Sequence, residues 1–157
     1  MLTVTFTVRP GQGDPNGFDL GDMVFEGELG TARSTGRVPD AGMMIYLSVT
    51  LLLDGLRQLL DDRRKVVHFT AVDSSFGLVF RRNKAGASVS SGSEVIARTS
   101  RSDLAEAVLA AAENLEASGV AALPGDDVGR ADYVAALDAF RAVIPAVGED
   151  PGAGRRH

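Results

Sequence analysis

The chain has 157 residues, 45% of them apolar, and its 16 basic and 21 acidic side chains give a formal net charge of −5. This length and composition indicate one globular domain and exclude wholesale disorder. The chain contains no cysteine, which excludes disulfides, thiolate metal sites and thiol catalysis. Aromatic residues make up 6% of the chain and none is a tryptophan, which leaves few stacking platforms for single-stranded nucleic acid.

The N-terminal segment predicts a cytoplasmic protein. It alternates apolar residues with threonines and lacks the charged and apolar regions of a signal peptide. The most apolar stretch, residues 43–53, has 11 residues, whereas a membrane-spanning helix needs about 20. We therefore expect no membrane contact. Arginine outnumbers lysine 14 to 2, as is typical of a GC-rich bacterial genome.

The N-terminal part predicts two strands and one long helix. Residues 2–8 and 23–29 alternate apolar and polar side chains, as strands with one buried face do. Residues 9–22 between them are rich in glycine and proline, which predicts an antiparallel hairpin with a long loop. We expect Asp40 to cap a helix at about 42–62. Apolar side chains surround most of this helix, so it should form the core.

The C-terminal part predicts a meander followed by two helices. The expected strands are residues 66–72, 77–82, 88–90 and 94–99, of which the third is weak. Their short connections favour antiparallel pairing, because parallel strands need longer crossovers. Ser100 or Ser102 should cap a helix that ends at Ser118. A last helix at about 131–144 should end before Pro145.

Together these elements predict a single α+β domain of residues 1–146. Its antiparallel sheet should contain about five or six strands, packed against the long central helix and the two C-terminal helices. Residues 147–157 should form a flexible C-terminal tail. The sequence pattern leaves open the order of the strands and the role of the glycine-rich loop.

Charge is unevenly distributed along the chain. Residues 1–62 carry a net charge of −5, residues 63–101 carry +6, and residues 102–157 carry −6. A positive meander between two acidic segments suits an anionic partner. The simpler interpretation is that basic strands and acidic helices are solvated neighbours that compensate one another.

Two loop patterns resemble known ligand sites only in part. Residues 11–17 are rich in glycine but lack the spacing of a phosphate-binding loop, and a strand rather than a helix follows them. Asp14, Asn16 and Asp19 suggest a calcium loop, yet the glutamate at its twelfth position is missing. We expect no metal and no cofactor.

His68 is the one histidine inside the predicted fold. It could act as a base toward Ser74 or Ser75, with Asp73 orienting it, which would make the chain a hydrolase. Neither serine stands in a nucleophile elbow, and neighbours on one hairpin seldom meet in the geometry of a triad. We expect a structural histidine and no catalytic residues.

The functional class that fits these features is a non-enzymatic protein–protein interaction module, such as an immunity or adaptor protein. The alternatives are a small-ligand-binding domain with a pocket between sheet and helix, or the hydrolase that uses His68. Nucleic acid is disfavoured, because the basic residues lie on strands and turns rather than on a recognition helix. The weak strand at 88–90 could be an open sheet edge that accepts a strand of the partner. A sheet edge could also support homo-oligomers.

Two sets of side chains could bind the protein partner. Arg81 and Arg82 suit an anionic partner, and because they are adjacent on a strand they should face opposite ways. A basic partner would instead meet the outer faces of the last two helices. The acidic candidates there are Glu106, Glu113, Glu116 and Asp138.

Overall fold

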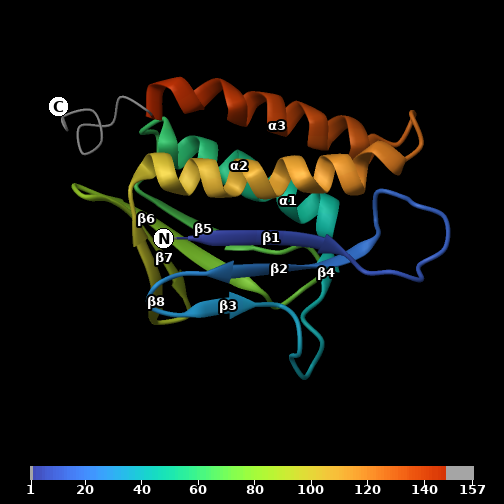
Figure 1. Cartoon of the computed structure of the whole chain (residues 1–157), viewed down its shortest axis with the longest axis horizontal. Helices are drawn as coiled ribbons and strands as arrows, with labels where there is room; N and C mark the ends of the chain where they lie inside the picture. Colours follow the sequence, from blue (N-terminus) through green and yellow to red (C-terminus); the bar gives the residue numbers. More distant parts are fainter. Residues whose placement is uncertain (1, 148–157) are drawn as a thin grey trace.

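The computed structural model describes residues 2–147, which form three helices and two four-stranded sheets (Figure 1). Sheet A consists of β1 (Thr3–Val8), β2 (Leu20–Glu26), β3 (Thr31–Arg33) and β4 (Met43–Met44). Sheet B consists of β5 (Val66–Thr70), β6 (Gly77–Asn83), β7 (Gly86–Ser91) and β8 (Glu94–Thr99). The helices are α1 (Ile45–Leu60), α2 (Arg101–Ser118) and α3 (Val128–Val147). The predicted tail lies outside the described residues from position 148 onward.

The α+β class and the antiparallel pairing are confirmed, but the single sheet is wrong. β2 is paired with β1 on one side and with β3 and β4 on the other, while β5 to β8 form a separate meander in chain order. The two sheets meet where the Leu29 amide donates to the Ile96 carbonyl at 3.0 Å. Gly27 touches the Ile96 backbone so closely that a Cβ would collide with it. The sequence pattern shows strand faces, but it does not show this junction.

The second predicted strand is displaced by three residues. β2 begins at Leu20 and ends at Glu26, and Met23 and Phe25 point into the core as predicted. Leu29, which was expected to share their buried face, is exposed. The chain turns after Glu26 so that β3 can pair with the end of β2, and this turn carries Leu29 out of the strand.

The predicted N-cap of the central helix is also wrong. α1 begins at Ile45, and no side chain caps it; instead the Ile45 amide donates to the Asp19 carbonyl at 3.1 Å. Met43 and Met44, which precede the helix, pair with β2. Asp40 is engaged elsewhere, by the Arg9 guanidinium. A neighbouring backbone carbonyl thus takes the place of the expected capping side chain.

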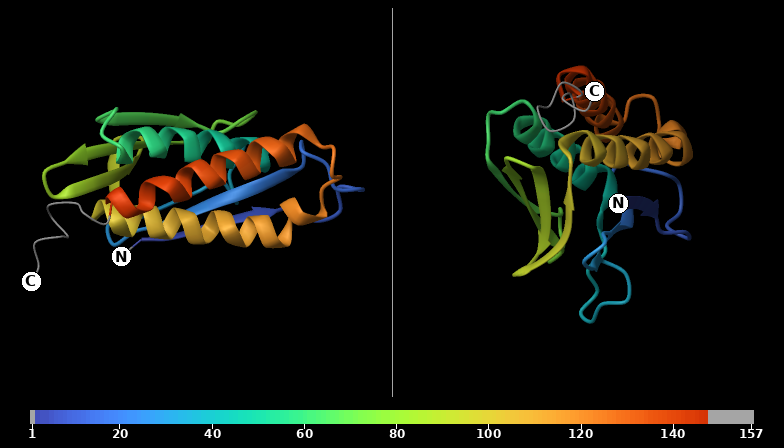
Figure 2. Two further views of the ribbon diagram at one scale, coloured as in Figure 1. Left: turned by 90° about the horizontal axis from the view of Figure 1, so that it is seen from above. Right: turned by 60° about the vertical axis from the view of Figure 1, so that its left-hand side comes forward.

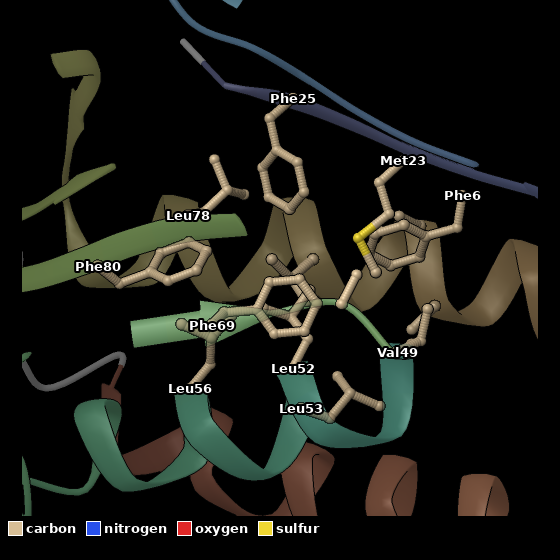
Figure 3. Close-up of a cluster of buried hydrophobic side chains, with 14 of the residues drawn as sticks. Phe6, Met23, Phe25, Val49, Leu52, Leu53, Leu56, Phe69, Leu78 and Phe80 are labelled. Carbon is tan, nitrogen blue, oxygen red and sulfur yellow. The ribbon is translucent and has the colours of Figure 1, made fainter. Parts of the chain in front are cut away.

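The core position predicted for α1 is confirmed. Its inner residues meet both sheets. In Figure 3 Leu52 lies in one cluster with Phe69 of sheet B and Met23 of sheet A. The sheets contact each other beside it, where the Phe25 and Phe80 rings lie edge to face at 6.2 Å. α3 covers the opposite side of α1 (Figure 1).

Side-chain caps determine where the two C-terminal helices begin. Ser100 Oγ accepts the Asp103 amide at 3.0 Å and caps α2, as predicted. Asp127 Oδ1 accepts the Arg130 amide at 3.2 Å, so α3 begins several residues before the predicted start. The predicted stop at Pro145 is wrong, because α3 continues to Val147. A proline in the last turn removes a single amide from the helix, and that loss does not end it.

An ion cluster built on the buried Asp22 fixes the loops around sheet A. The Arg9 guanidinium donates to Asp22 at 2.9 and 3.1 Å and to both oxygens of Asp40 at 2.8 Å. Ser34 Oγ adds a third hydrogen bond to Asp22 at 2.7 Å. These bonds hold the segment after β3 against the end of β1.

The same cluster shifts the acidity of its members. Hydrogen bonding to Arg9 lowers the pKa of Asp22 and of Asp40 below their usual values, because both carboxylates are stabilised in their charged form. Hydrogen bonding to Asp40 and then Asp22 raises the pKa of Arg9. The cluster is therefore ionised throughout the neutral pH range.

Leu52→Ala should lower the free energy of unfolding by about 2–5 kcal/mol, because it leaves a cavity between α1 and the sheets. Leu51→Ala is the matched control, since Leu51 lies on the same helix and is 52% exposed; its effect should stay within about 0.5 kcal/mol. Denaturant titration of both variants measures the difference. Equal effects would mean that α1 is not the core.

Asp22→Asn should lower the free energy of unfolding by about 1–3 kcal/mol at pH 7, because it weakens charge-assisted hydrogen bonds in a buried site. The folded-state pKa of Asp22 is depressed, so its stabilisation is full above the unfolded value of about 3.9 and is lost as pH falls below it. Urea titrations from pH 7 to pH 3 should show the gap between wild type and variant closing. A gap of constant size would contradict the assigned role of the Asp22 charge.

Candidate functional site

The outer face of sheet B carries predicted binding residues and is not covered by a helix. In the right panel of Figure 2 the strands of sheet B stand with the helices and sheet A on one side only. Leu78 and Phe80 of β6 point into the core, and Arg81 points outward. We call the outward residues the cationic face: Val66, His68, Val79, Arg81, Ser88 and Arg98.

The two arginines of the cationic face flank a serine. Arg81 is paired with Ser88 on β7, and Ser88 is paired with Arg98 on β8. Neighbouring strands lie about 4.8 Å apart, so the two arginine backbones stand about 10 Å apart on one face. Among the described residues, neither guanidinium makes a hydrogen bond or an ion pair. Their charges are available to a partner.

Arg82 faces the opposite way from Arg81, as predicted, and lines a separate pocket. Its guanidinium and that of Arg101 both donate to Asp62 Oδ1, the latter at 2.8 Å. Lys65, Arg82, Asn83, Lys84 and Arg101 line this pocket of about 280 Å³ between the end of β6 and the start of α2. We call it the Arg82 pocket.

The predicted acidic residues are partly neutralised by a cation of their own. Arg141 of α3 contacts Glu113 at 3.1 Å, Glu116 at 3.4 Å and Asp138 at 2.9 Å. Glu106 lies apart from this cluster, in a groove of about 510 Å³ between α2 and the first residues of the chain. The structure thus brings together three of the four acidic candidates.

The predicted sheet edge at residues 88–90 is wrong, because β7 lies between β6 and β8. The edges of sheet B are β5 and β8. On β8 the Ile96 carbonyl already accepts a hydrogen bond from the Leu29 amide. Bonds from the Arg82 amide to the Lys65 carbonyl and from the Ala71 amide to the Phe76 carbonyl fix the pairing of β5. Backbone groups alternate in an antiparallel ladder, so those of His68 point away from β6, toward the free edge.

The expected structural role of His68 is wrong, because the side chain is exposed and makes no hydrogen bond within residues 2–147. It also lacks the surroundings that a hydrolase would need. It lines an open hollow of about 460 Å³ on the outer face, together with Arg37, Thr70 and Ser75. No carboxylate of the described chain lines this hollow. Ser74 Oγ donates to the Ala41 carbonyl at 2.6 Å and accepts the Phe76 amide at 3.1 Å, so it serves the turn.

The glycine-rich loop before β2 has a structural explanation. The side chain of Gln12 donates a hydrogen bond to the Leu20 carbonyl at 2.8 Å and accepts one from the Leu20 amide at 2.7 Å. This pair of bonds resembles that between two paired strand residues, and it closes the loop. The Gly17 amide donates to Asp127 at 3.0 Å and joins the loop to the start of α3. These contacts explain the length of the loop by its attachment to β2 and to α3.

Within residues 2–147, no three histidine or acidic side chains come together as a metal site. In the same part of the chain, no helix combines the length and apolarity needed to cross a bilayer. No family model, curated protein or solved structure matches the chain.

Sequence reasoning missed Arg98 and Arg101 as members of the cationic surfaces. Arg98 could have been found by carrying the strand alternation across the predicted meander, because it is the outward residue opposite Ser88. The bond from Arg101 to Asp62 joins residues 39 positions apart. No local pattern signals such a contact.

His68→Gln should change the free energy of unfolding by less than about 0.5 kcal/mol, because His68 is exposed and the change keeps a polar side chain. Ser74→Ala should cost about 1 kcal/mol, since it removes both hydrogen bonds of the turn. Thermal and denaturant unfolding of the two variants measure this contrast. A larger loss for His68→Gln would show that the histidine supports the fold.

Proposed function

We propose that this chain is a non-enzymatic protein–protein interaction module that binds an acidic protein partner through the cationic face. The single observation that carries the proposal is the Arg81–Ser88–Arg98 row, in which two arginines stand on an uncovered sheet with no carboxylate contact among the described residues. The bare guanidiniums can form bidentate bonds with carboxylates.

The composition of the face supports protein binding. Val66 and Val79 are partly exposed between the polar residues, so apolar and cationic contacts alternate on this face. Protein interfaces combine an apolar centre with arginine, which is enriched at such sites, and arginine is frequent among residues that dominate binding. The cationic face offers both.

The acidic helix surface fits a partner less well. Arg141 already contacts Glu113, Glu116 and Asp138, so a basic partner would have to replace existing ion pairs. Exposed ion pairs contribute little energy, yet they reduce the field that steers association. Among the described residues, a partner of the cationic face has no ion pair of Arg81 or Arg98 to replace, which favours this face over the acidic helix surface.

Arg81→Ser with Arg98→Ser should abolish capture of the partner from a lysate of the source organism. The matched control carries Glu113→Gln, Glu116→Gln and Asp138→Asn, and it should capture the same partner as wild type. Association of the captured partner should slow about tenfold or more in the arginine variant, and in wild type it should slow as salt rises. Circular dichroism verifies that all variants are folded.

Two results would overturn the proposal. One is a partner that binds the arginine variant as tightly as wild type but is lost from the acid-neutralised control. The other is an affinity that ignores ionic strength up to physiological salt, which would point to an apolar contact. In that case the free edge of β5, at His68, becomes the better candidate, because it can accept a strand of the partner.

A further inference from the structure

We propose that the Arg82 pocket binds the phosphate group of a small phosphate monoester. The pocket lies on the opposite side of β6 from Arg81, so this inference does not rest on the proposed function. Four cationic side chains and one amide line it. Its volume of about 280 Å³ lies below the range of common drug-sized ligand sites, and it suits a small anionic headgroup.

The two guanidiniums of the pocket are fixed before any ligand arrives. The side chains of Arg82 and Arg101 are only 15% and 17% exposed. Both donate to the same oxygen of Asp62, so they converge on one point in space. Convergent guanidiniums are the arrangement that recognises planar carboxylate and tetrahedral phosphate oxygens.

The Asp62 carboxylate lies where we expect the phosphate group to bind. Its carboxylate is 66% exposed, in contrast to the arginines that hold it. It follows the last turn of α1 with φ of 70°, a left-handed conformation that non-glycine residues rarely adopt. An exposed carboxylate on this short turn can leave the arginines when a stronger anion competes for them.

The remaining lining residues favour a doubly charged ligand. Lys65 and Lys84 make no ion pair within residues 2–147. Together with Arg82 they place three positive charges beside the carboxylate of Asp62. A phosphate monoester dianion brings two charges and several acceptor oxygens, so it balances this excess better than a carboxylate does.

The test is a titration of the full chain with inorganic phosphate at pH 7.5, with chloride adjusted to keep ionic strength constant. Amide shifts of Asn83 and Lys84 in NMR spectra report binding. Asp62→Asn removes the competing charge and suits the left-handed conformation, so it should tighten binding roughly tenfold. Lys84→Gln should weaken binding, because it removes one of the charges that attract the dianion.

Asp61→Asn is the matched control. It changes the net charge equally, but Asp61 is paired with Arg63 at 2.6 Å, and neither residue lines the pocket. It should leave the phosphate affinity within about twofold of wild type, as screened exposed charges do. Adenosine monophosphate and phosphoserine, titrated in the same way, distinguish a nucleotide from a phosphorylated amino acid as the source of the phosphate.

The proposal is overturned if neither wild type nor Asp62→Asn shows a saturable phosphate shift. It is equally overturned if Asp61→Asn tightens binding as much as Asp62→Asn, because the effect would then reflect net charge alone. Tightening confined to Asp62→Asn, with loss in Lys84→Gln, supports a site in which Asp62 and phosphate compete. Arg81→Ser with Arg98→Ser should leave this titration unchanged, which separates it from the binding of the protein partner.

Discussion

The structure depends on the burial of α1 on nearly its whole circumference. A helix with apolar side chains on most of its surface needs neighbours in every direction, and no single sheet can supply them. Sheet A, sheet B and α3 together enclose it, and the Phe25 and Phe80 rings close the gap between the two sheets. Charged side chains are consequently excluded from the centre and collect on the outer face of sheet B and at the ends of elements. The placement of the cations is thus a consequence of the core.

The alternation of β6 then divides these cations between two surfaces. Adjacent residues of a strand point to opposite faces, so Arg81 reaches the open face while Arg82 turns toward α1 and α2. On the open face Arg81 lies between Val66 and Ser88, neither of which is charged. On the other side Arg82 contacts Asp62, which follows the end of α1. Arg101, the first residue of α2, contacts the same carboxylate. Arg81 therefore has no carboxylate partner among the described residues, whereas Arg82 shares the Asp62 carboxylate with Arg101.

Local patterns predicted much of this fold, and long-range contacts account for most of what they missed. The faces of β1 and β2, the burial of α1, the Ser100 cap and the opposite directions of Arg81 and Arg82 all follow from residue spacing. The separation into two sheets depends on the hydrogen bond between Leu29, in the turn after β2, and Ile96 of β8. The spacing of residues in the sequence does not predict this contact. Asp40 has the right residue type for a cap, but Arg9, 31 positions away, binds it instead. Of the candidate site, the residue types were predictable and their partners were not.

Three ion clusters within residues 2–147 are unbalanced, and their imbalances differ in sign. One arginine holds two carboxylates at Arg9, and one arginine contacts three carboxylates at Arg141. At Asp62 the ratio is reversed, since one carboxylate serves two arginines beside two further lysines. Pairing among the described residues thus leaves negative charge on sheet A and the helix layer, and positive charge on sheet B. A charged partner feels such an asymmetric field before contact, so the same segregation that lets the core exclude charge can also orient an acidic protein toward the cationic face.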